Sequence, residues 1–195
     1  MQKMTKRRLQ AIRTKNKILE TALPMVREKG FNNVSVDEIC SAAGIAKGTF
    51  YHHFERKEGI FGDTGIMMND EEVDNLLNDK QMSTYEKICI LMNSYVQLAE
   101  DQGLDITRAI MRSFLEGSGI YHEGTLGREV LRCVVEEGAA RHEFKPSLDN
   151  ERVIDLVQAF SAGLIVFWCS NDGNYDLVEK ANSLAKQWLR VTLFK

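Results

Sequence analysis

The sequence predicts an all-α protein, with a three-helix helix-turn-helix domain at the N-terminus and a larger helical domain after it. Apolar residues recur at spacings of three and four along almost the whole chain, which is the periodicity of an α-helix. The 195 residues include only 2 prolines, and no alternating run of β-branched residues indicates a strand. Residues 35–54 read as a short helix, a glycine turn and a second short helix, the layout of a helix-turn-helix.

The N-terminal domain is expected to hold three short helices. The first covers about residues 14–29, ends at Gly30 in the position of a left-handed cap, and kinks at Pro24. The second begins at Ser35, because Ser35 and Glu38 have the spacing of a capping box. The apolar residues with the spacing to pack inward on the first helix are Ile39, Ile45, Phe50 and Phe54.

About nine helices are expected in total. The six after the N-terminal domain cover approximately residues 57–79, 83–101, 105–117, 125–143, 149–170 and 175–194. We place the domain boundary at residue 60, which gives one domain of residues 1–60 and another of residues 61–195.

Charge is divided unevenly along the chain, although the net charge is only −3. Residues 1–57 carry 12 Lys or Arg against 5 Asp or Glu, a net charge of +7. Residues 58–195 carry 13 against 23, a net charge of −10. This division indicates that the N-terminal domain binds a polyanion, unless it is a chance gradient of charge.

The composition, 44% hydrophobic and 27% charged, is that of a soluble globular protein, and we expect it in the cytoplasm. No uninterrupted apolar run approaches the length of about 18 residues that a membrane helix needs. The basic N-terminus lacks the apolar core of a signal peptide. No metal site or cofactor is expected. The four cysteines lack metal-ligand spacing and are expected to be reduced and buried, with a redox sensor as the alternative: Cys40, Cys89, Cys133 and Cys169.

The second helix of the helix-turn-helix leaves polar side chains on its outer face. Lysine can bind a phosphate or a guanine edge, hydroxyl groups can donate to phosphate oxygens, and imidazole can do either. Gly48 has no side chain, so the backbone can approach a DNA groove closely. The pattern indicates DNA binding, although short amphipathic helices with a polar face also occur for other reasons. The side chains expected at the outer face or its edges are Lys47, Thr49, Tyr51, His52 and His53.

A set of short motifs with regular spacing extends over about residues 14–61. They lie at residues 18–22, 29–31, 34–39, 43–45, 48–54 and 57–58. In residue type and spacing, the set resembles the N-terminal domain of TetR-type (tetracycline-repressor-like) transcriptional regulators. The resemblance implies an all-helical homodimer with an N-terminal DNA-binding domain and a C-terminal domain for ligand binding and dimerisation. Such proteins typically repress transcription and leave the operator when a small molecule binds.

The resemblance also implies which residues contact DNA. By position, base edges are faced by Ala46, Lys47, Gly48 and His52, and the DNA backbone is contacted by Ser35, Thr49, Tyr51 and Lys57. Ala46 is a departure, because the family often has serine there, capping the recognition helix. Alanine at a cap costs on the order of 1 kcal/mol and removes one donor to phosphate.

The last two helices, near residues 149–170 and 175–194, are expected to form a four-helix bundle with their copies in a second subunit. The resemblance to the family supports this arrangement, and a twofold dimer suits a palindromic operator. Gly163 would cost about 1 kcal/mol within its helix unless a neighbouring helix approaches closely there. An intramolecular core is the alternative. The apolar residues that exceed one helix face are Leu156, Val157, Phe160, Leu164, Phe167, Trp168, Leu184, Trp188 and Leu189.

A cavity for a small-molecule effector is expected in the second domain. Methionine and aromatic side chains adapt to apolar ligands, while Tyr95 and Arg112 would supply polar anchors. For each single residue, an ordinary core or surface position is the alternative. The candidate lining residues are Met92, Tyr95, Met111, Arg112, Phe114 and Tyr121.

Gly59, Gly62 and Gly65 recur at three-residue spacing at the start of the helix expected over residues 57–79. Each costs roughly 1 kcal/mol relative to alanine inside a helix. One hypothesis is a hinge between the ligand pocket and the DNA-binding domain. The other is that these glycines allow close packing on the first helix, and the sequence favours neither.

We therefore expect a DNA-binding transcriptional regulator, a repressor that binds a palindromic operator as a dimer and is released by a small molecule. The alternative is an architectural or cell-division DNA-binding protein of the same fold without an effector. An enzyme is disfavoured because the sequence shows no defensible catalytic motif, and no catalytic residue is expected. A ligand carrier would leave the basic N-terminus unexplained.

Overall fold

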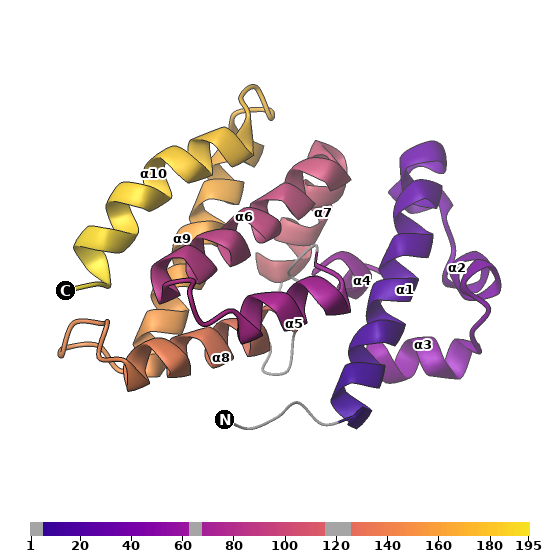
Figure 1. Ribbon diagram of the computed structural model, residues 1–195. Helices are drawn as coiled ribbons and strands as arrows, with labels where there is room; N and C mark the ends of the chain where they lie inside the picture. The colour runs from indigo at the N-terminus through magenta and orange to yellow at the C-terminus, as the bar shows by residue number, and fades with distance from the viewer. Residues whose placement is uncertain (1–5, 63–67, 116–125) are drawn as a thin grey trace. The chain divides into compact units, whose positions relative to one another are not determined.

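The structure is a computed structural model and describes residues 6–62, 68–115 and 126–195 (Figure 1). In these ranges the chain forms ten α-helices, one short 3₁₀-helix and no strand, so the all-α prediction is confirmed. An isolated antiparallel bridge joins Phe144 to Phe194.

The helices group into two units. The first unit contains α1 (Lys6–Lys29), α2 (Val36–Ala43), α3 (Lys47–His53), α4 (Gly59–Gly62) and α7 (Leu104–Leu115). The second contains α5 (Asp70–Asn78), α6 (Thr84–Gln102), α8 (Leu126–Ala140), α9 (Asn150–Ser170) and α10 (Leu177–Thr192). The domain boundary at residue 60 stays a prediction.

Helix α1 is the element on which α2, α4 and the 3₁₀-helix η1 (Phe31–Asn33) pack in the first unit. It begins at Lys6 rather than near residue 14, since residues 6–13 contain neither proline nor glycine to stop a helix. It continues through Pro24, where the expected kink stays a prediction. Its buried residues include Ile18, Leu19, Ala22, Leu23 and Val26.

A tight turn joins α2 to α3. Gly44 ends α2 with φ 64° and ψ 39°, a left-handed conformation that glycine adopts without strain. The capping box at Ser35 and Glu38 is present as the sequence predicts. Behind the turn, Ile39 and Phe50 are fully buried. The two helices therefore share an apolar core, and the other side of α3 is exposed.

The prediction of a single helix over residues 57–79 is wrong. Helix α4 ends at Gly62, and Met68 and Asn69 are not helical. Asn69 has φ −78° and ψ 171° and begins α5 as its N-cap, where it forms a capping box with Glu72. The side chain of Asn69 offers the backbone a local hydrogen bond that competes with helix continuation, which the apolar periodicity does not register.

The glycine stripe is only partly described. A Cβ built on Gly59 would lie 3.6 Å from the ring of Phe54, which is ordinary van der Waals contact. Close packing therefore does not require glycine at position 59. Gly65 lies outside the described residues. The hinge and packing hypotheses both remain predictions, and the break at Asn69 means that neither can assume one continuous helix.

The second unit is built on α6. Helix α10 packs along α6, and both contact α9 (Figure 1). Ser83 caps α6 with Glu86 in a second predicted capping box, and the helix ends at Gly103, which has φ 84°. Arg128 on α8 pairs with Glu151 at the start of α9, at a distance of 3.1 Å.

The contact between α6 and α8 combines charge and close packing. Lys87 is fully buried, and its Nζ lies 2.7 Å from the carboxylate of Glu137. One residue along α8, Gly138 lies against α6. A Cβ there would be 2.5 Å from Cγ2 of Thr84 and 2.8 Å from the ring of Phe144. No side chain larger than hydrogen fits at this position without a shift of these neighbours.

Helix α9 has two apolar faces. One is buried within the unit and includes Val157, Leu164 and Trp168. The other is open, since Phe167 is 70% exposed and a Cβ on Gly163 would meet no atom within 4 Å. Among the helices of the described ranges, α9 alone has the length and apolar composition of a membrane span. Within its most apolar stretch of 18 residues, 44% is buried inside the protein. A core helix of a soluble protein passes the same test, so this is weak evidence for a membrane.

Candidate nucleic-acid interface

The predicted recognition helix α3 has a buried side and an exposed side. Phe50 is fully buried, while Tyr51, the next residue, is 51% exposed. The fold thus presents most of the predicted DNA-contacting residues to solvent from one unit. Exposed positions are Ser35, Ala46, Lys47, Gly48, Tyr51 and His52, and half-buried positions are Thr49 and Lys57.

Lys47 forms an ion pair with Asp37 that joins the start of α3 to the first turn of α2. Its Nζ lies 2.8 Å from Oδ1 and 2.9 Å from Oδ2 of the carboxylate. The hydrogen bond and the charge of Asp37 raise the pKa of the Lys47 ammonium. Sequence reasoning missed this pair, because it depends on how the turn orients the two helices.

Ser35 is held within the protein by its capping box. Its hydroxyl donates to Glu38 at 2.9 Å, and Lys29 Nζ lies 3.0 Å from the same carboxylate. The backbone N–H of Ser35 and the side chain of Lys29 lower the pKa of Glu38 from 4.5 to about 2. A DNA phosphate would compete with Glu38 for the hydroxyl donor of Ser35.

Ala46 occupies the N-cap of α3 with φ −72° and ψ 146°, the extended backbone typical of a cap. No side chain caps this helix. The structure thus lacks a side-chain hydrogen bond at the N-cap of α3, as alanine at position 46 predicts.

Lys57 connects elements inside the first unit. Its Nζ donates to the carbonyl oxygens of Phe31 at 2.6 Å and Val34 at 2.8 Å. The ammonium also lies 4.3 Å from the centre of the Phe31 ring. Two of its three N–H donors are thus used within the protein, and one is left for a DNA phosphate.

The predicted effector-binding residues have mixed positions. Met92 is buried and Tyr95 is half-buried on α6, in the second unit. Met111 is half-buried and Arg112 is exposed on α7, in the first unit. The side chain of Phe114 and the whole of Tyr121 lie outside the described residues. The six-residue set stays a prediction.

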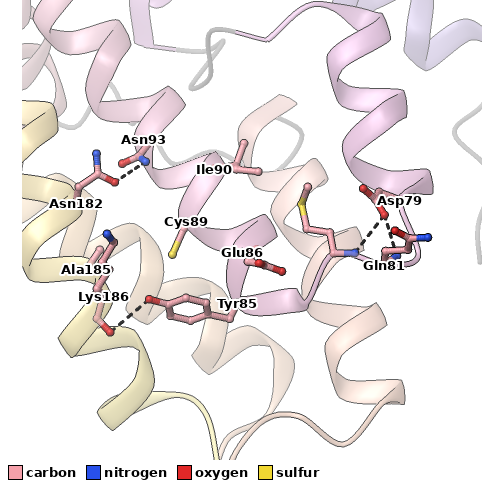
Figure 2. A pocket seen from close by; sticks show the side chains of 11 residues that line it. Asp79, Gln81, Tyr85, Glu86, Cys89, Ile90, Asn93, Asn182, Ala185 and Lys186 are labelled. Atoms are coloured by element: carbon pink, nitrogen blue, oxygen red, sulfur yellow. Dashed lines mark hydrogen bonds between the residues drawn. The ribbon is translucent and has the colours of Figure 1, made fainter.

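A groove of about 480 Å³ lies between α6 and α10 in the second unit (Figure 2). Asn93 donates to Asn182 at 2.7 Å, and the Tyr85 hydroxyl donates to the carbonyl of Lys186 at 3.5 Å. None of the predicted effector-binding residues lines this groove. Its lining consists of Asp79, Gln81, Met82, Tyr85, Glu86, Cys89, Ile90, Asn93, Asn182, Ala185 and Lys186.

Sequence reasoning missed the groove because it requires two helices about 90 residues apart in the chain to pack side by side. Burial raises the pKa of the Cys89 thiol beside it, which favours the unreactive protonated form. All four cysteines are free, with Cys40 and Cys169 buried and Cys89 and Cys133 half-buried. Among the residues described, no group of three or more His, Cys, Asp or Glu could hold a metal ion.

Comparison with known proteins agrees with the helix-turn-helix geometry. Residues 18–64 match the tetR family of bacterial regulatory proteins. The probable acrEF/envCD operon repressor of Escherichia coli (strain K12) is 22% identical over 208 residues, which cover 98% of this chain and 91% of that protein. The fatty acid metabolism regulator protein of Bacillus subtilis (strain 168) is 26% identical over 173 residues, which cover 86% and 89% respectively.

Solved structures share the fold. The fatty acid degradation regulator FadR from Bacillus halodurans superposes with a TM-score of 0.54 and 23% identity, covering 90% of this chain and 93% of that one. A capped helix-turn-helix with an exposed polar recognition helix, joined to a larger helical unit, defines a DNA-binding transcriptional regulator. The helix-turn-helix of this chain, within residues 18–64, is that of the tetR family of bacterial regulatory proteins.

Proposed function

We propose that this chain represses transcription by binding a palindromic operator as a homodimer, and that a small apolar effector releases it. The observation that carries the proposal is the exposed polar side of α3 within the match to the TetR family over residues 18–64. The basic charge of residues 1–57, a net +7, supports DNA as the partner.

The proposed DNA contacts are those that the resemblance to the family implies, and the exposure of α3 supports them. Ala46, Lys47, Gly48 and His52 would face base edges in the major groove, with Lys47 suited to guanine. The backbone contacts would come from Ser35, Thr49, Tyr51 and Lys57. Tyr51 is the strongest of these candidates, because half of its surface is open to solvent while its ring packs against Phe50 at 5.3 Å.

Dimerisation is proposed through the open faces of α9 and α10. Phe167 is 70% exposed on α9 and Val191 is 68% exposed on α10. Phe160 of α9 stacks on Trp188 of α10 with ring centres 4.3 Å apart. The open space at Gly163 supports the close approach of a helix from a second copy. An apolar surface of this kind is typical of a protein interface.

The effector is proposed to be an amphiphile with a long apolar chain, such as a fatty acid or its thioester. The support is the 26% identical relative that is named a fatty acid metabolism regulator. The buried Met92 of the second unit has the flexible apolar side chain that suits such a ligand. A regulator with such a role would act in the cytoplasm.

A gel-shift assay with the DNA upstream of the protein's own gene tests the proposal. The wild-type protein should form a discrete complex, and Tyr51→Ala should weaken it while the circular dichroism spectrum stays unchanged. Lys47→Ala should do the same. Palmitoyl-CoA should dissociate the protein–DNA complex, whereas free CoA should not. Binding that covers DNA without sequence preference, unaffected by acyl thioesters, would instead favour an architectural protein.

A further inference from the structure

The ion pair between Asp37 and Lys47 occupies the surface that the proposed function assigns to DNA. The pair spans the turn of the helix-turn-helix, with both carboxylate oxygens within 2.9 Å of the ammonium. The Lys47 side chain is 54% exposed and that of Asp37 is 69% exposed. A duplex that contacts Lys47 would therefore also meet the carboxylate of Asp37.

Lys47 is the only lysine or arginine within residues 30–55. Because it is paired with Asp37, the helix-turn-helix of residues 35–54 carries no unpaired lysine or arginine in the free protein. The attraction of this segment to the phosphate backbone of DNA of any sequence is therefore reduced. Such binding depends on protein cations that displace the counterions of the phosphates.

We propose that Asp37 is a specificity-determining residue, whose carboxylate holds Lys47 and opposes binding to DNA of arbitrary sequence. This inference rests on the proposed function of the surface. On non-matching DNA the base acceptors are not aligned with α3, so Lys47 gains phosphate contacts at most. Forming these contacts means breaking the ion pair beside a carboxylate that the phosphates repel. A matching site offers Lys47 base acceptors and additional contacts from the rest of α3, which offset that loss.

The neighbouring charges leave this role to Asp37. The carboxylate of Glu38, the next residue, is bound by Lys29 at 3.0 Å and by the capping box. Glu38 is therefore already neutralised inside the first unit. Asp37 instead neutralises the cation of the recognition helix itself.

The experiment compares binding to two duplexes over a range of salt concentrations. One duplex is selected by the wild-type protein from random-sequence DNA, and the other is a scrambled version with the same base composition. The variants are Asp37→Asn, Lys47→Met and the double variant. Glu28→Gln is the matched control, since it removes one negative charge from an exposed position of α1. Thermal melting checks that each variant is folded.

Asp37→Asn should bind the scrambled duplex about fivefold more tightly, the factor that corresponds to the upper strength of an exposed ion pair. Its salt dependence on that duplex should steepen by about 0.9 in the logarithmic slope, as expected for one more net phosphate contact. Binding to the selected duplex should change less, so the ratio of the two affinities falls. Adding Lys47→Met should cancel the gain, and Glu28→Gln should leave the ratio unchanged.

Two results would overturn the inference while leaving the proposed function in place. One is an unchanged affinity ratio and slope in Asp37→Asn. The other is a gain that persists in the double variant, or that Glu28→Gln reproduces. Failure of the wild-type protein to select any duplex would instead overturn the proposed function, and this inference with it.

Discussion

The ammonium of Lys87 lies 2.7 Å from the carboxylate of Glu137, in an ion pair that joins α6 to α8. The lysine is fully buried, whereas Glu137 also binds Lys80 at 3.2 Å and Arg141 at 2.6 Å. One carboxylate thus serves three cations, and Lys87 is the one without access to water.

The two sides of this pair should differ in their sensitivity to mutation. Glu137→Gln leaves the Lys87 charge buried without its carboxylate, and the free energy of unfolding should fall by about 3–5 kcal/mol. Lys87→Met keeps a long apolar side chain in the same space, so its loss should be clearly smaller. Urea denaturation of both variants at pH 7 checks the difference. Equal losses would show that the buried charge does not decide the stability of this contact.

Acid should weaken the same contact. Burial alone would raise the pKa of Glu137, but the hydrogen bonds from Lys87 and Lys80 hold it below the ordinary value of 4.5. A carboxyl group whose pKa is lowered by folding contributes its full stabilisation when the pH is above the pKa that the group has in the unfolded chain. This stabilisation should therefore be present above pH 4.5 and decline as the pH falls through the lower folded pKa. Urea denaturation of the wild type and of Glu137→Gln at a series of pH values tests this. The difference between their free energies of unfolding should shrink as the pH falls.

Glu38 should show a similar dependence in the first unit. Its pKa is lowered from 4.5 to about 2, so its stabilising effect should be lost between these two pH values. The carboxyl chemical shift of Glu38 measures the titration directly. In Ser35→Ala, which removes the capping hydroxyl, the titration should move toward 4.5 and the fold should lose about 1 kcal/mol. A midpoint near 4.5 in the wild type would contradict the capping network.

Ala46→Ser should stabilise the protein. Position 46 already has the backbone conformation of an N-cap, and a serine hydroxyl there can accept a hydrogen bond from the first turn of α3. We expect a gain of about 1 kcal/mol in the free energy of unfolding, measured by chemical denaturation. Ala42→Ser, at an exposed position within α2, is the matched control and should give no gain. If both variants behave alike, the cap is not limiting.

Lys57→Met should destabilise the first unit. The substitution leaves the carbonyl groups of Phe31 and Val34 without their cationic donor, and a loss of about 2 kcal/mol is expected. The same variant tests the proposed contact with the DNA backbone. If the third N–H reaches a phosphate, the logarithmic salt slope of DNA binding should fall by about 0.9. A stability loss with an unchanged slope would limit Lys57 to its role inside the protein.

Phe167→Asp should abolish the dimer. The side chain is 70% exposed on the open face of α9, so a charge there costs the subunit little but opposes an apolar interface. Sedimentation should show a monomer, and operator binding should weaken because two half-sites are no longer read together. Leu115→Asp, at an exposed position of α7, serves as the control and should remain dimeric. A dimeric Phe167→Asp variant would place the interface elsewhere.

The features predicted correctly are those with local causes. Ser35 and Ser83 begin helices because hydroxyl and glutamate lie three residues apart, and Gly44 ends one because its own backbone conformation requires it. The start of α5 has a cause of the same kind. It was missed because Asn69 interrupts a stretch whose apolar spacing otherwise continues.

The features that escaped prediction depend on residues brought together by folding. Asp37 and Lys47 meet only because the turn sets the angle between α2 and α3. Lys57 was expected at the DNA backbone, yet its ammonium binds carbonyl groups more than 20 residues earlier in the chain. Apolar periodicity indicates which side of a helix is buried. It does not indicate which polar side chain of another helix will lie opposite.

The close contact at Gly138 should also restrict which residues related sequences have at the contacting positions. A Cβ there would lie 2.5 Å from Thr84 and 2.8 Å from Phe144, so a side chain at position 138 requires that one of these neighbours first becomes smaller. Homologues that keep the threonine and the phenylalanine should keep the glycine. In lineages that have gained a side chain at position 138, we expect a smaller residue at position 84 or 144. The substitution that removed the bulk should have preceded the one that filled the space.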